Sequence, residues 1–351
     1  MEVVEYTQLG NTGVFVSRIC LGAMTFGGAG SIFEAIGGLR QHDVDALVAN
    51  SLDAGVNFID TANVYAGGES EVMTGKALGQ RRRDVVVATK VFGRMGPGAN
   101  QVGLSRLNIM REAEASLERL NTDYIDLYQI HGFDPLTPFE ETLGALTDLV
   151  RQGKVRYIGC SNLAAWQIMK SLGVSTLGHL EKFVTLQAYY SLAGRELERE
   201  IGPMLLDQKM GLLVWSPLAG GFLTGKFKRS GDTDDNARRK KFNFPPVDIE
   251  KGYAIVDAME VVAARHGATV PQVALRWLLA QPTVTSVIIG AKNTDQLKDN
   301  LASVDLKLDE TDLNELNEAS RLTPEYPGWM FMGDDRRPGQ VRDWSKLLKK
   351  P

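Results

Sequence analysis

The sequence predicts an α/β fold in which eight parallel strands, each followed by a helix, close into a barrel. Eight short apolar runs of β type alternate along the chain with stretches of helical spacing. Such alternation is typical of parallel sheets, and eight strand–helix units are enough to close one. The 351 residues suit one (β/α)8 TIM barrel domain spanning residues 1–351, with long loops at the carboxyl ends of its strands.

A β-hairpin at residues 5–17 is expected to begin the chain. Its centre, residues 10–13, reads Gly-Asn-Thr-Gly, which suits a tight turn. The eight barrel strands are expected after it, each as a short, mostly apolar run. They are residues 18–21, 56–60, 85–90, 124–131, 155–159, 183–187, 212–215 and 286–289.

Helical spacing is clear in two of the intervals between these runs. Residues 110–120 form one helix candidate, with Ser105 as a possible cap. Residues 138–150 form another, because Pro138 is suited to a helix start and Gly153 lies just past the end.

Two long segments break the regular alternation. They are an extended polar loop at about 222–248, after the seventh run, and a C-terminal loop and tail at about 321–351. Long loops at the carboxyl ends of barrel strands usually carry function.

The composition is that of an ordinary globular protein and indicates a cytoplasmic location. The net charge of −4 argues against a nucleic-acid partner or a polybasic membrane anchor. No apolar run approaches the roughly 18–20 residues that span a bilayer, and the acidic N-terminus does not resemble a signal peptide. Cys20 and Cys160 lie in apolar runs, which favours buried, reduced thiols over a disulfide. The oligomeric state is not readable.

Four side chains that can hold or move a proton follow three of the predicted strands. Asp60, Lys90 and His131 each close an apolar run, and Tyr65 lies in the loop after Asp60. If the runs are barrel strands, their carboxyl ends meet at one rim, where barrel enzymes have their active sites. Each residue alone is more often a turn former, a cap or a structural residue. The joint pattern favours catalysis.

The chemistry of the four residues fits together. A tyrosine with a pKa near 10 is a poor proton donor at neutral pH, and a neighbouring Lys90 ammonium would lower the pKa of Tyr65. Asp60 could keep Lys90 charged and in place, while His131 could hydrogen-bond a substrate oxygen. Tyr65 would then protonate an oxygen on which negative charge develops, as in carbonyl reduction.

These residues occur in motifs that resemble the aldo-keto reductase family. The resemblance runs from about residue 9 to residue 300. It rests on the segments 55–65 (GVNFIDTANVY), 87–90 (VATK) and 126–131 (DLYQIH). By this resemblance Tyr65 is the general acid, Lys90 and Asp60 tune it, and His131 orients the carbonyl.

The resemblance also implies a nicotinamide cofactor, since no side chain supplies hydride. The dinucleotide fingerprint G-x-G-x-x-G is absent, because Phe33 stands where its last glycine is required after Gly28 and Gly30. This counts against a Rossmann dehydrogenase. Residues 220–226 fit the P-loop pattern G-x-x-x-x-G-K, but Phe227 replaces the required Ser or Thr, so ATP hydrolysis is disfavoured.

The nicotinamide end of the cofactor is expected near four residues. Ser161, Asn162 and Gln187 resemble groups that bond the carboxamide, and Trp215 would stack on the ring. Core packing is the alternative for Trp215. The remaining residues that the resemblance implies at the cofactor are Gly22, Met24, Thr25, Asp60, Ser216, Pro217, Leu218, Gly220, Gly290, Gln296 and Asn300.

The phosphates are expected near three cations. Lys226 and Arg238 could meet the pyrophosphate, although residues 238–241 could equally be a solvated basic patch. The strand–loop–helix at residues 289–300 resembles the family's last cofactor segment and would put a helix N-terminus near phosphate. Lys292 would meet the adenosine 2′-phosphate there, which favours NADP(H). An exposed lysine with no ligand is the alternative.

The substrate is expected to be a small carbonyl compound in an apolar pocket, and bulky or aromatic groups would suit the large side chains on the long loops. Candidate lining residues include the terminal cluster at 329–332. The candidates are Met24, Phe26, Tyr65, Phe92, His131, Phe133 and Trp329.

Two rival functions stay open at this point. Potassium-channel β subunits share the resemblance in the Trp215 segment, so a cofactor-binding regulatory or redox-sensing subunit is the alternative; His131 favours an enzyme because those subunits carry asparagine there. Lys90 could instead form a Schiff base, although a charged lysine beside Asp60 is a poor nucleophile. The histidines, His42, His131, His179 and His266, lack metal-ligand spacing, so no metal is expected.

Overall fold

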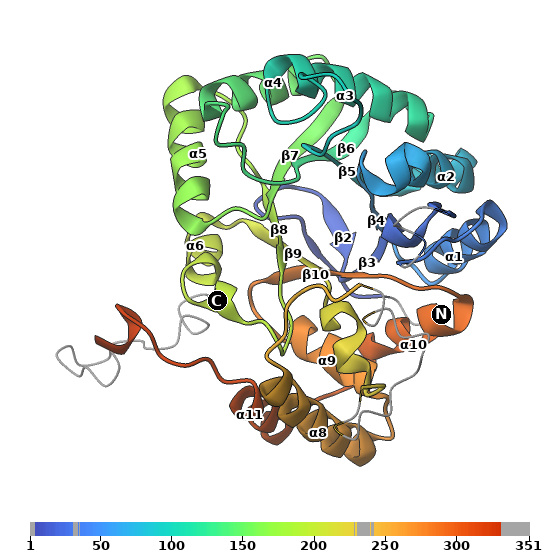
Figure 1. Ribbon diagram of the computed structural model, residues 1–351, viewed down its shortest axis with the longest axis vertical. Helices are drawn as coiled ribbons and strands as arrows, with labels where there is room; N and C mark the ends of the chain where they lie inside the picture. The colour runs from blue at the N-terminus through green and yellow to red at the C-terminus, as the bar shows by residue number, and fades with distance from the viewer. Residues whose placement is uncertain are drawn as a thin grey trace.

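The computed structural model describes residues 4–30, 34, 36–227, 229, 239 and 242–330. Eight parallel strands form a closed barrel, in which β3 to β10 follow one another in chain order and β10 pairs with β3 (Figure 1). The strands are β3 (Ile19–Gly22), β4 (Phe58–Asp60), β5 (Val86–Val91), β6 (Ile125–Ile130), β7 (Val155–Ser161), β8 (Thr185–Tyr189), β9 (Gly211–Trp215) and β10 (Val284–Ile289). The predicted (β/α)8 barrel is confirmed.

Helices surround the barrel on its outside (Figure 1). They are α1 (Gln41–Asp53), α2 (Glu69–Leu78), α3 (Arg106–Leu120), α4 (Phe139–Arg151), α5 (Ala165–Gly178), α6 (Ile201–Gln208), α8 (Ile249–His266), α9 (Val270–Leu279), α10 (Thr294–Leu301) and α11 (Glu310–Ala319). The Ser105 side chain accepts a hydrogen bond from the backbone N–H of Asn108, so it caps α3 as predicted. Pro138 precedes α4 as its N-cap, and Gly153 follows the helix with a positive φ of 74°.

The predicted N-terminal hairpin is confirmed as well. Strands β1 (Tyr6–Gln8) and β2 (Phe15–Ser17) pair antiparallel in a separate two-stranded sheet. Leu9 and Val16 of this hairpin are fully buried and pack against the inward-facing residues of the barrel. The hairpin therefore closes the amino-terminal end of the barrel, and the carboxyl end is left for the site.

The part of the barrel interior nearer the amino-terminal ends of the strands is apolar. Its buried cluster includes Cys20 of β3, Phe58 of β4, Ala88 of β5, Leu127 of β6 and Leu213 of β9. Because successive strand side chains point to opposite faces, the residue two positions further along each strand also faces inwards, nearer the carboxyl end.

On three of these strands, the next inward position holds a polar side chain. Asp60 follows Phe58 in this way, and Lys90 follows Ala88. Gln129 has the same relation to Leu127. The period of two thus stacks a polar layer on the apolar one, and the barrel register brings the members of the polar layer side by side.

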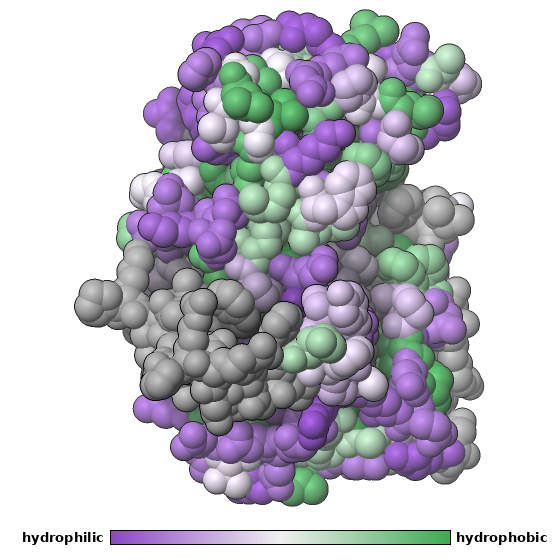
Figure 2. Space-filling model, turned by 90° about the vertical axis from the view of Figure 1, so that its left-hand side faces the viewer, coloured by the Kyte–Doolittle hydropathy of each residue, from purple (hydrophilic) through white to green (hydrophobic). Residues whose placement is uncertain are grey.

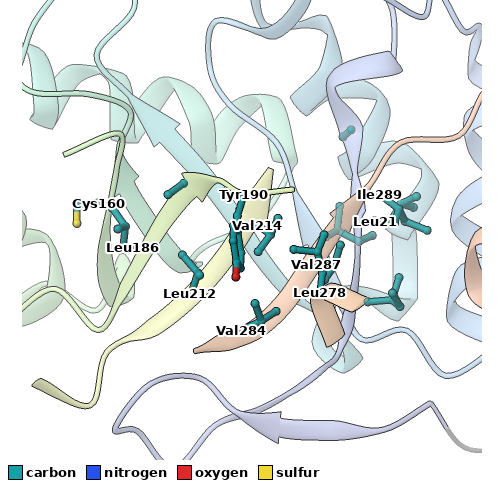
Figure 3. Packing of buried hydrophobic residues seen from close by; sticks show 14 of the residues in the cluster. Leu21, Cys160, Leu186, Tyr190, Leu212, Val214, Leu278, Val284, Val287 and Ile289 are labelled. Atoms are coloured by element: carbon teal, nitrogen blue, oxygen red, sulfur yellow. The ribbon is translucent and has the colours of Figure 1, made fainter. Parts of the chain in front are cut away.

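The outward faces of the strands pack against the helices in a second, larger core. Figure 3 shows part of it, where Leu212 and Val214 of β9 lie near Val284 and Val287 of β10. Leu278 of α9 contributes from the surrounding helices. Burial of these side chains fixes the helices against the barrel and so fixes the loops that carry the site.

Both cysteines are buried and neither forms a disulfide. The side of the molecule drawn in Figure 2 is largely hydrophilic, with hydrophobic residues in separate groups. Among the described residues, no helix has the length and apolar character that crossing a membrane requires.

Candidate active site

The Lys90 ammonium lies at the centre of a buried polar cluster at the carboxyl end of the barrel. Its Nζ donates to Asp60 Oδ1 at 2.6 Å, to the backbone oxygen of Thr61 at 2.7 Å and to the Tyr65 hydroxyl at 3.2 Å. Lys90 has no exposed surface and Asp60 is 3% exposed. Burial alone would lower the pKa of Lys90, but the charge of Asp60 and the contact with Tyr65 raise it overall. Lys90 is therefore a cation.

The second carboxylate oxygen of Asp60 is also fully engaged. Gln187 Nε2 donates to Asp60 Oδ2 at 2.7 Å, and Gln129 Nε2 donates to it at 3.1 Å. Strands β5, β6 and β8 thus each provide a donor to one carboxylate of β4. A buried charge is tolerated only when it is paired and hydrogen-bonded, as Asp60 is here.

Tyr65 reaches Lys90 because the chain folds back after β4. The backbone N–H of Thr61 donates to the backbone oxygen of Ala88 at 2.9 Å, and that of Asn63 donates to the backbone oxygen of Lys90 at 3.3 Å, so the loop crosses the end of β5. Tyr65 then begins a short 3-10 turn, η3 (Tyr65–Gly68). Its ring centroid lies 4.8 Å from Lys90 Nζ.

His131 lies directly after β6 and contacts the same phenol. Its ring meets that of Tyr65 edge-on, with centroids 5.7 Å apart and an interplanar angle of 76°. Burial, and secondarily the charge of Lys90, lowers the pKa of His131 to about 3. The imidazole is therefore neutral at ordinary pH and offers one donor and one acceptor. The four residues singled out in the sequence are brought together.

A cavity of about 680 Å³ opens beside this cluster. Tyr65 and His131 line one part of it, and Lys226 and Lys292 line another. Every residue expected at the cofactor lines this cavity, except Arg238, which lies outside the described residues. The set is Gly22, Met24, Thr25, Asp60, Ser161, Asn162, Gln187, Trp215, Ser216, Pro217, Leu218, Gly220, Lys226, Gly290, Lys292, Gln296 and Asn300.

The cavity has further lining residues that the sequence did not single out. They are Ile36, Val64, Gly221, Thr224, Phe227, Phe244, Pro271, Ile288, Ile289, Ala291 and Asp299. Most of them are immediate sequence neighbours of expected residues, and this proximity could have predicted them. Gln129 was missed too, although it lies on β6, two residues before His131.

Trp215 is hydrogen-bonded to the wall of the cavity. Its Nε1 donates to Asn162 Oδ1 at 3.0 Å, and Asn162 Nδ2 donates to the backbone oxygen of His131 at 3.1 Å. The indole stacks on Phe244, with centroids 5.7 Å apart and an interplanar angle of 8°. Tyr189 also lies beside it, at 5.2 Å. Phe244 comes from the long loop, where spacing gives no signal of this contact.

The lysine end of the cavity is more exposed. The backbone N–H of Lys292 donates to Gln296 Oε1 at 2.9 Å, and Asn293 caps α10 by accepting from the backbone of Gln296. Asn300 donates to the backbone oxygen of Gly290. The Lys292 side chain is exposed, as is that of Lys226.

Several expected substrate residues lie elsewhere. Phe26 does not line the cavity: it is fully buried in the outer core, because its neighbours Met24 and Thr25 face the cavity and it faces the helices. Phe92 and Phe133 are partly buried outside the cavity lining. Trp329 is 50% exposed, and its ring contacts Tyr326.

The basic segment at 238–241 is described only at Arg239. Arg239 is 6% exposed and Nη1 donates to the backbone oxygen of Ala219 at 2.9 Å, with its guanidinium over the ring of Phe222. It therefore anchors the loop and is not part of a solvated patch. In the described part of the chain, no cluster of three His, Cys, Asp or Glu residues could hold a metal ion.

A buried lysine–carboxylate pair beside a phenol, at the wall of a large cavity in a (β/α)8 barrel, is the arrangement expected of a barrel enzyme that moves protons. Comparison with known proteins identifies the family within that class. A family model described as the aldo/keto reductase family matches residues 18–321. The chain belongs to the aldo/keto reductase family, and so is an oxidoreductase of a kind that acts on carbonyl compounds.

Three relatives illustrate the range of the similarity. An uncharacterized oxidoreductase of Bacillus subtilis is 38% identical over 93% of this chain and 100% of its own length. The versiconal hemiacetal acetate reductase of Aspergillus parasiticus is 35% identical over 93% of this chain and 99% of its own. A probable voltage-gated potassium channel subunit beta of Arabidopsis thaliana is 35% identical over 86% and 92%, respectively.

Proposed function

We propose that this protein reduces aldehyde or ketone carbonyls to alcohols, reversibly and with NADPH, and that Tyr65 is the general acid. The observation that carries the proposal is the position of Lys90 Nζ, which touches both Asp60 and the Tyr65 hydroxyl. An ammonium in contact with the phenol oxygen stabilises the phenolate that remains after the proton has left. Tyr65 can therefore give its proton to an oxygen on which negative charge develops.

The other two residues of the cluster have separate roles in this proposal. Asp60 keeps Lys90 charged, which also argues against a Schiff base, because a protonated lysine is not a nucleophile. His131, neutral and in ring contact with Tyr65, donates a hydrogen bond to the substrate oxygen and holds it near the phenol.

Several groups that line the cavity support NADP(H) as the cofactor. Bound NADPH would supply the hydride, which no side chain can provide. Asn162 and Ser161 offer polar groups near His131 for the carboxamide, and Lys226 and Lys292 offer cations for the phosphates. Because Phe244 stacks on Trp215, nicotinamide stacking there requires the other face of the indole or a shift of Phe244.

A regulatory or redox-sensing subunit is the alternative, motivated by the relative named as a potassium channel subunit. His131, which lies against the Tyr65 ring where potassium-channel β subunits carry asparagine, favours the enzyme. The relative named as a reductase favours it as well.

The test is consumption of NADPH by the purified protein with an activated aldehyde, such as nitrobenzaldehyde, or with a reactive dicarbonyl. Turnover that requires both cofactor and carbonyl is expected. Tight NADPH binding without turnover of any carbonyl would instead support the subunit. The protein should also keep its activity in EDTA, since no step in the proposal uses a metal.

A further inference from the structure

A second buried polar network lies behind the active site, between α2, α3, the strand β5 and the loop that precedes Tyr65. Its centre is Arg119, near the end of α3. Arg119 Nε donates to Glu71 Oε2 at 2.6 Å, and Arg119 Nη2 lies 3.9 Å from Glu112 Oε2. Glu71 is fully buried and Glu112 is 4% exposed. Glu71 is thus hydrogen-bonded to this guanidinium, while Glu112 lies between it and Arg111, whose Nε donates to Glu112 Oε1 at 3.4 Å.

The two carboxylates hold the chain on both sides of Tyr65. On one side, Asn63 Nδ2 donates to Glu112 Oε2 at 3.1 Å, and Asn63 stands two residues before Tyr65. On the other side, Glu71 lies in the first turn of α2, directly after η3. The segment that presents the phenol is therefore hydrogen-bonded to Glu112 on one side and continues into the helix of Glu71 on the other, and both carboxylates lie near Arg119.

The same network reaches the strand that carries Lys90. Thr89, the neighbour of Lys90 on β5, donates its hydroxyl to Glu71 Oε1. Glu71 thus bonds the lysine strand and Arg119 together, one residue away from the ammonium. The distance from Lys90 Nζ to the Tyr65 hydroxyl depends on both segments, and both depend on Glu71.

The aliphatic part of the Arg119 side chain also packs directly against Gly68, at the end of the segment that carries Tyr65. Gly68 has φ +100°, and a Cβ there would lie 2.7 Å from Arg119 Cδ. Only glycine gives the arginine room to cross the loop at this point. Arg119 therefore has an electrostatic and a steric contact with the loop, while its own helix lies outside the cavity.

We infer that Arg119 is a positioning residue for catalysis: with Glu71 and Glu112, it sets the place of the Tyr65 hydroxyl relative to Lys90. This inference rests on the proposed role of Tyr65. A misplacement of about 1 Å at a reacting group can cost about a hundredfold in rate. Arg119 touches neither the cavity nor the expected substrate, so its loss should change the rate of the chemical step and not the binding steps.

The test is Arg119→Lys, which keeps the charge but replaces the planar fork with a single ammonium. The value of kcat should fall about ten- to hundredfold. The KM for the carbonyl and the Kd for NADPH should stay within about twofold, and the amides of residues 61–69 should exchange hydrogen faster. Arg106→Lys is the matched control, because Arg106 lies on the same helix but pairs with Asp148 of α4. That control should leave kcat and the exchange unchanged.

A second variant keeps the test valid if Arg119→Lys fails to fold. Glu112→Gln keeps an oxygen that can accept from Asn63 but removes the charge that attracts Arg119 and Arg111, so kcat should fall in the same direction by a smaller factor. Unchanged kcat in both variants would overturn the inference. Equal losses in kcat, NADPH affinity and thermal stability would overturn it too, since they indicate a purely structural role. Wild-type protein without turnover would refute the proposed function instead, whereas unchanged exchange at residues 61–69 would refute the positioning role alone.

Discussion

Two lysines of the same cavity region show how differently one residue type is used. Lys90 has no exposed surface, and its three hydrogen bonds go to Asp60, Thr61 and Tyr65. Lys292 is exposed and lies at the start of a capped helix. The first is held in one place by the fold, while the second is a charge at the edge of solvent. Changes at the buried end should therefore cost much more than changes at the exposed end.

The largest effect is expected from Asp60→Asn, which leaves the Lys90 ammonium buried without its countercharge. Breaking a buried ion pair in this way costs about 3–5 kcal/mol of unfolding free energy. Denaturant unfolding measures it. Asp53→Asn is the control, because the pair of Asp53 with Arg81 is exposed and its loss should change stability little. Equal losses in the two variants would show that burial is not what distinguishes the Asp60 pair.

Tyr65→Phe is expected to have the next largest effect, on rate and not on stability. The ring and its contact with His131 remain, but the proton donor is lost. General acid catalysis contributes at least about a hundredfold, so kcat should fall by that factor or more while the Kd for NADPH hardly changes. Single-turnover kinetics and cofactor titration measure the two quantities. A variant that turns over like the wild type would remove Tyr65 from its role.

Lys292→Ala tests the exposed end of the comparison. A charge-assisted contact with the 2′-phosphate is worth about 1.5–3 kcal/mol, and exposure puts Lys292 at the lower end, near a tenfold loss of NADPH affinity. NADH affinity should stay almost unchanged, and the NADPH loss should shrink with added salt. Lys298→Ala is the control, because Lys298 is an exposed lysine of α10 that does not line the cavity.

Two results would contradict this assignment of Lys292. An equal loss of affinity for NADPH and NADH would mean that Lys292 stabilises its loop and does not bind the 2′-phosphate. A wild-type protein that prefers NADH would refute the NADP(H) proposal altogether.

The parts of the site that the sequence predicted are those set by local rules. Strand period and the order of motifs identified the barrel and placed Asp60, Lys90 and His131 at one end of it. Gln129 obeys the same period, but a glutamine in a strand has no mark that separates a buried hydrogen-bond donor from an ordinary polar residue. Its role depends on Asp60, which is far away in sequence.

What the sequence could not predict depends on how loops pack. Phe26 was expected among the large apolar side chains that line the pocket, yet it is buried in the outer core. Phe244 and Arg239 come from the long loop, where no period relates residue spacing to direction, and only the fold brings them to Trp215 and Ala219. The network around Arg119 was missed for a similar reason, since its members lie on two helices, one strand and a loop.

The smallest expected effect is the pH dependence that His131 contributes to stability. The pKa of His131 is about 3 in the folded protein, against 6.5 for an ordinary histidine. Between these values the unfolded chain binds more protons, so stability falls as the pH drops from 6.5 towards 3 and is unaffected above that window. From pH 7 to pH 5.5 the loss should be about 1 kcal/mol.

Urea unfolding of the wild type and of His131→Asn at both pH values measures this loss, because the contributions of the other titrating groups cancel in the comparison. The wild type should lose more stability than the variant. An equal loss would mean that His131 is solvated and titrates normally, and the neutral imidazole assumed for substrate binding would then hold only above about pH 6.5.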